Sequence, residues 1–106
     1  MNTSASSSLL KTVELIKSGS LDGFEDEVEV GMKSDLPDIQ GWINLGIACA
    51  QHKRLDEAVL IFKLLRGIGE PDLQVLYNLG LAYAMQGKLH EALEAYDCAL
   101  EMNPVE

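Results

Sequence analysis

The residues that could support catalysis or metal binding are few in this chain of 106 residues. It has two cysteines, Cys49 and Cys98, and two histidines, His52 and His90. Cys49/His52 and His90/Cys98 lack the paired spacing of a zinc site, and no Ser-His-Asp arrangement or phosphate-binding loop can be assembled. Both histidines fall near expected helix ends and are expected on the solvated surface. We therefore predict that the protein is not an enzyme and uses no cofactor or metal.

The two thiols also bear on the compartment. The first ten residues, MNTSASSSLL, contain no basic segment of the kind that opens an export signal. We expect both cysteines to be reduced, buried and small apolar residues of a cytoplasmic protein; a disulfide between them is the alternative. No apolar run approaches the ~20 residues that span a bilayer.

The charge is strongly acidic, with 17 Asp and Glu against 8 Lys and Arg and a net charge of -9. This balance argues against binding nucleic acid, which depends on Lys and Arg, and against an anionic membrane surface. It favours solubility and a basic partner. The hydrophobic fraction of 47% is high enough for a packed core.

One stretch of the chain, residues 42–71, occurs a second time at 76–104. The matching pairs are Asn44/Asn78, Leu45/Leu79, Gly46/Gly80, Ala48/Ala82, Leu55/Leu89, Glu57/Glu91, Ala58/Ala92 and Phe62/Tyr96. A period of about 34 residues is typical of a solenoid built from helix-turn-helix repeats. Apolar spacing and Gly or Pro breaks predict an all-α protein. The six expected helices cover about 4–18, 21–32, 38–52, 55–67, 72–86 and 89–102.

The pattern resembles the tetratricopeptide repeat family. The signature positions of the last unit hold Leu76, Leu79, Gly80, Tyr83, Ala92, Tyr96, Ala99 and Pro104. Those of the preceding unit hold Trp42, Leu45, Gly46, Cys49, Ala58, Phe62, Leu65 and, one place late, Pro71. Residues 5–38 match only in outline, which indicates a divergent first repeat.

The resemblance implies a single domain over 1–106. It would be a right-handed superhelical solenoid of three repeats and six antiparallel helices. After a frayed end at 1–4, the repeats would cover 5–38, 39–72 and 73–106. Gly46 and Gly80, with Ala58 and Ala92, are expected to let the two helices of each pair approach to about 8–10 Å.

In this family the first helices of successive pairs line a concave groove that binds a peptide or helical segment of another protein. By resemblance the groove residues are Leu9, Leu10, Val13, Ile16, Lys17, Gln40, Ile43, Asn44, Ile47, Gln51, Gln74, Tyr77, Asn78, Leu81 and Met85. Asn and Gln side chains suit the backbone of an extended peptide because they offer both donors and acceptors. The alternative is that the apolar members are buried against neighbouring repeats.

Some family members hold an acidic C-terminal tail of heat-shock chaperones through a clamp of Lys, Asn, Asn, Lys and Arg. Only Asn44 matches; the other positions hold Leu9, Val13, Gln74 and Asn78. The groove looks more like that of members that shelter an apolar or amphipathic client segment, such as bacterial secretion chaperones. We therefore expect a scaffold, either an adaptor or chaperone-like.

The last helix suggests a different function. The family usually adds a polar-faced capping helix, and the chain ends at Pro104-Val105-Glu106 without one. The expected helix over 89–102 is apolar around much of its circumference, more than one neighbour can cover. Self-association through Leu93, Tyr96 and Leu100, in its simplest form a two-fold dimer, is the alternative, as is a fragment of a longer repeat array.

Overall fold

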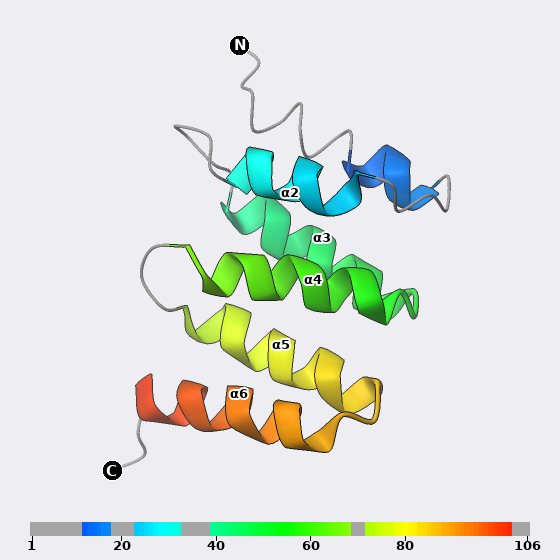
Figure 1. Ribbon diagram of the computed structural model, residues 1–106. Helices are drawn as coiled ribbons and strands as arrows, with labels where there is room; N and C mark the ends of the chain where they lie inside the picture. Colours follow the sequence, from blue (N-terminus) through cyan, green and yellow to red (C-terminus); the bar gives the residue numbers. More distant parts are fainter. Residues whose placement is uncertain (1–11, 18–22, 33–38, 69–71, 103–106) are drawn as a thin grey trace.

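The computed structural model describes residues 12–17, 23–32, 39–68 and 72–102, and all regular structure within them is α-helical (Figure 1). Residues 12–17 are helical. The following helices are α2 (Phe24–Met32), α3 (Ile39–Gln51), α4 (Leu55–Arg66), α5 (Leu73–Met85) and α6 (Leu89–Met102). The predicted frayed end and the predicted groove residues Leu9 and Leu10 lie outside the described residues.

The helices stack in sequence order, and the chain reverses direction between consecutive helices from α3 to α6 (Figure 1). The most extensive packing joins α5 to α6, α3 to α4 and α4 to α5, and α2 and α3 make smaller contacts with α4 and α5, respectively. Each helix therefore packs against near neighbours in the sequence, as in a solenoid. The helices from α3 onward begin and end within one residue of their predicted limits. By contrast, α2 begins at Phe24 rather than near Leu21.

The ends of these helices have clear local causes. Gly23 has a φ of 76° and cannot be part of α2, which explains the later start. The carboxylate of Asp72 accepts hydrogen bonds from the backbone N–H groups of Gln74 (2.8 Å) and Val75 (3.2 Å) and so caps α5. Lys53 and Gly87, at equivalent positions of successive pairs, both adopt positive φ. Each closes a Schellman turn between the two helices of a pair.

The core runs along the stack and combines a few large side chains with many small ones. Its largest fully buried members are Trp42, Phe62, Ile43, Ile61 and Leu79. The small buried residues are Ala58, Ala82, Ala92, Ala95 and Ala99, most of them on the second helix of a pair. Small residues at these positions let the helix backbones approach closely.

Two glycine contacts set the spacing within the pairs. A methyl group on Gly46 would lie 2.6 Å from Cζ of Phe62, and one on Gly80 would lie 2.6 Å from Cε1 of Tyr96. Each glycine is thus covered directly by an aromatic ring from the second helix of its own pair. No other residue fits at these positions without a shift of that ring.

We expect Gly46→Ala to lower the free energy of unfolding by about 2 kcal/mol in urea denaturation followed by circular dichroism. A helical alanine gains about 1 kcal/mol over glycine, but overlap with the buried Phe62 ring costs up to about 3 kcal/mol. Gly67→Ala is the matched control: Gly67 has a negative φ, and an added methyl group would meet its nearest atom at 3.6 Å. Equal stability of the two variants would contradict the close approach at Gly46.

Candidate protein-binding surface

Exposed apolar side chains are concentrated in the last two helices. Of the nine large apolar residues that are exposed within the described residues, eight belong to α5 and α6. They are Leu73, Tyr77, Leu81, Met85, Leu89, Leu93, Leu100 and Met102. A contiguous exposed apolar patch in a soluble domain typically marks an interaction site, whereas single exposed residues such as Val30 need no explanation.

On α5 the exposed large apolar residues recur at every fourth position, as Leu73, Tyr77, Leu81 and Met85. We call this set the α5 row. Residues four apart share one face of a helix, so the row covers the side of α5 opposite its buried residues, among them Leu79. Neither α3 nor α5 contains a charged residue.

On α6 the apolar residues Leu89, Leu93, Tyr96 and Leu100 follow the spacing i, i+4, i+7 and i+11. We call this set the α6 stripe. Its three leucines are exposed, and Tyr96 is half-buried over Gly80. The predicted association residues Leu93, Tyr96 and Leu100 therefore all lie on this stripe.

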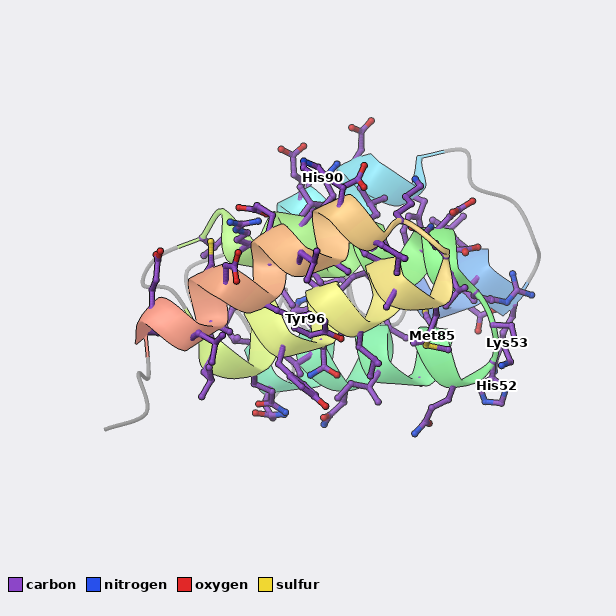
Figure 2. The ribbon with its side chains drawn as sticks, turned by 90° about the horizontal axis from the view of Figure 1, so that it is seen from below. His52, Lys53, Met85, His90 and Tyr96 are labelled. Atoms are coloured by element: carbon purple, nitrogen blue, oxygen red, sulfur yellow. The ribbon has the colours of Figure 1, made fainter. Side chains whose placement is uncertain are left out.

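The α5 row and the α6 stripe meet through two tyrosines. The rings of Tyr77 and Tyr96 lie with their centroids 5.9 Å apart and are tilted by 47°. When the helix stack is viewed from the end at which α6 lies, Tyr96 points toward α5, and His90 lies on the opposite edge of α6 (Figure 2). The two sets therefore form one continuous apolar surface.

Polar amides border this surface on α3 and α5. Nε2 of Gln40 donates to Oδ1 of Asn44 at 3.1 Å, and Nδ2 of Asn78 donates to the carbonyl oxygen of Gln74 at 2.8 Å. These local bonds orient the two asparagine side chains.

The predicted groove residues differ in their exposure. The exposed members are Gln40, Asn44, Gln51, Gln74, Tyr77, Leu81 and Met85, joined by Lys17. The half-buried members are Val13, Ile16, Ile47 and Asn78, of which Ile16 and Ile47 pack against the core.

One predicted groove residue is wrong: Ile43 is only 1% exposed and belongs to the core. Its equivalent in the following repeat, Tyr77, is 55% exposed. The difference arises because α3 contacts both α4 and α5, whereas no helix within the described residues follows α6 and covers Tyr77. Leu73 and Leu89 were missed by the sequence reasoning, although each lies four residues before a predicted site residue.

The charge around the α6 stripe is negative. Residues 72–102 contain five carboxylates and a single lysine, Lys88. On α6, Glu94 is paired: it accepts hydrogen bonds from Nη1 and Nη2 of Arg66 at 3.1 and 2.8 Å. This hydrogen bonding lowers the pKa of Glu94 and ties α6 to α4. Within the described part of the chain, Asp97 and Glu101 form no such ion pair.

The same salt bridge borders a hollow of about 340 Å³ on another side of α6. Its lining consists of Arg66, Asp72, Val75, Leu76, Cys98, Glu101 and Met102. Across the described ranges, no group of three or more His, Cys, Asp or Glu side chains could hold a metal ion. None of the helices in those ranges is long and apolar enough to cross a membrane.

The two cysteines are both free thiols but differ in environment. Cys49 is buried, and burial, followed by the charge of Glu57, raises its pKa to about 11. Cys98 is half-buried rather than buried as expected. Its pKa is raised by partial burial and then by its hydrogen bond to Glu94.

We expect iodoacetamide at pH 8 to modify Cys98 first and to leave Cys49 unmodified in the folded protein. The thiolate is the reactive form, and a pKa of about 11 instead of 9.0 lowers the thiolate fraction of Cys49 about 100-fold. Mass spectrometry of the digested protein measures both rates, with the urea-unfolded chain as the control. Equal rates for the two thiols in the folded protein would show that Cys49 is not enclosed by the core.

Comparisons with known proteins agree with this geometry. The model of the tetratricopeptide repeat family matches residues 73–104. A solved structure of a MamA mutant has the same fold, with a TM-score of 0.74 and 24% sequence identity over 94% of this chain and 73% of that chain. No curated protein sequence matches. Residues 73–104 thus match a tetratricopeptide repeat, and the chain shares the helical solenoid fold of that solved structure.

Proposed function

We propose that the protein is a scaffold that binds a peptide or amphipathic segment of a partner protein across the exposed faces of α3 and α5. The matched tetratricopeptide repeat supports a protein–protein interaction module. The observation that supports the finer proposal is the α5 row, four large apolar side chains exposed at every fourth position. Such a row offers successive apolar contacts to a ligand along its whole length.

The chemistry of the two faces indicates the kind of ligand. Because α3 and α5 contain no charged residue, these faces offer no cation for an acidic tail. The exposed amides of Gln40, Asn44, Gln51 and Gln74 offer donors and acceptors for a peptide backbone. The ligand we propose is therefore an apolar or amphipathic segment with little charge. Binding of such a segment would suit an adaptor or chaperone-like protein of the cytoplasm.

Peptides selected against the protein from a random display library provide the test. We expect the selected peptides to be apolar and to bind the variant Asn44→Ala/Leu81→Ala at least about tenfold more weakly, since the two changes remove one contact from each face. Fluorescence polarisation of a labelled peptide measures the affinity.

Val30→Ala is the matched control, because Val30 is equally apolar and is 63% exposed on α2. Circular dichroism checks that each variant is folded. If the selected peptides bind the Asn44/Leu81 double variant as tightly as the unaltered protein, the ligand does not bind on these faces and the proposal is wrong.

A second candidate function is self-association through the α6 stripe. The exposure of Leu93 and Leu100 favours an interface of some kind on α6. Whether a second copy or another protein binds at that interface depends on its shape and charge.

A further inference from the structure

The helices α5 and α6 together form a face, called the second groove below, that is equivalent to the face of α3 and α4, called the first groove, against which α5 packs. Aligned positions that are buried in the first helix pair are exposed in the second. Ile43 and Val59, on the two sides of the first groove, are 1% and 8% exposed, whereas their equivalents Tyr77 and Leu93 are 55% and 61% exposed. Leu55 is half-buried, and its equivalent Leu89 is exposed. The second groove thus has the apolar lining of the first but lacks a helix to fill it within the described residues.

The occupant of the first groove indicates the shape that fits the second. α5 is a helix of 13 residues that presents Val75, Leu76, Leu79 and Ala82 to its neighbours. Both the α6 stripe and the aligned side of α4 run along a helix axis, so they suit a second helix lying alongside them.

The charges at the rim of the two grooves are opposite. On α4 the exposed Lys63 lies beside Val59 and Phe62. Its equivalent on α6 is Asp97, whereas Glu101 borders the hollow beside Arg66. Neither carboxylate forms an ion pair within the part of the chain that the structure describes. A helix in the second groove would gain from Lys or Arg on the flank that faces α6.

A second copy of this chain fits the groove poorly. The net charge of each copy is -9. Pairing of two α6 stripes about a two-fold axis would place Asp97 of one copy near the acidic rim of the other. Like charges brought together in this way disfavour association. The uncharged α5, which has the right shape, is already packed against α4 and α6.

We propose that the groove between α5 and α6 binds one amphipathic helix of a partner protein, a helix with an apolar face and a basic flank. Tyr77 and Tyr96 form the floor of this site, and Leu89, Leu93 and Leu100 form its α6 side. Asp97 selects the charge. The site shares Tyr77 with the α5 row but does not include Asn44 or Leu81.

Two synthetic helical peptides test the proposal. Both keep the buried residues of α5, namely Val75, Leu76, Leu79, Gly80 and Ala82, with alanine-rich turns added at each end. One has lysine and the other glutamate at the five exposed positions of α5. Isothermal titration calorimetry should show at least tenfold tighter binding of the lysine peptide. Its affinity should fall as the salt concentration rises.

Protein variants locate the binding site. The change Leu93→Gln/Leu100→Gln should reduce binding of the lysine peptide at least tenfold, and Asp97→Asn should remove most of the preference for lysine. Val30→Gln, with a similar exposure on α2, and Asn44→Ala/Leu81→Ala should both retain binding. If Val30→Gln or Asn44→Ala/Leu81→Ala weakens binding of the lysine peptide as much as Leu93→Gln/Leu100→Gln does, the helix binds elsewhere and the proposal is wrong.

Two other results would also overturn it. The first is equal binding of the two peptides, or no binding of either, because the acidic rim then has no role or the groove accepts no helix. The second is a stable dimer of the unaltered protein that Leu93→Gln/Leu100→Gln converts to monomer in light scattering. In that case a second copy, rather than a basic partner helix, covers the stripe.

Discussion

The close contact between a glycine and an aromatic ring within each helix pair determines the rest of this structure. Gly46 lies directly against Phe62, and Gly80 lies directly against Tyr96. Because no side chain separates the helices at these points, the ring of the second helix lies directly against the backbone of the first. The alanines around it complete a core in which backbone proximity matters more than side-chain volume.

This geometry also produces the exposed apolar surface of α5 and α6. Once two helices pack this closely, the side chains that flank the ring point into a shallow groove along the pair. In the pair of α3 and α4, which α5 follows and contacts, Ile43 and Val59 are buried. In the next pair, the same arrangement leaves Tyr77 and Leu93 exposed. Equivalent positions are thus buried in the pair that a described helix follows and exposed in the next pair.

Much of this architecture could be predicted from the sequence. The repeat period, with glycine and alanine at fixed places, predicted the helix pairs and the limits of α3 to α6 to within one residue. The reason is that helix packing of this kind depends on local spacing and on residue size. The later start of α2 was missed because the positive φ of Gly23 reflects a turn, and Gly23 reads equally well as a weak helical residue.

The exposure of the site residues was harder to predict. Helical periodicity places Ile43 and Tyr77 on the same face, and a repeat alignment gives them the same role. Only the packing of α5 against α3 shows that Ile43 is buried. Leu73 and Leu89 were missed for the same reason. Their spacing marks them as apolar helix residues, but it does not show whether a neighbouring helix covers them.

The central claim is that small residues and enclosed rings stabilise the repeats, while the leucines of the α6 stripe are left for contact with other molecules. Urea unfolding of the variant Leu89→Gln/Leu93→Gln/Leu100→Gln tests it most directly, with Leu79→Ala as the reference. Each surface change should alter the free energy of unfolding by no more than about 0.5 kcal/mol, whereas loss of the buried Leu79 should cost about 2–5 kcal/mol. We therefore predict that the triple variant is more stable than Leu79→Ala. A triple variant that unfolds as readily as Leu79→Ala, or more so, would show that the stripe belongs to the core and would contradict the account.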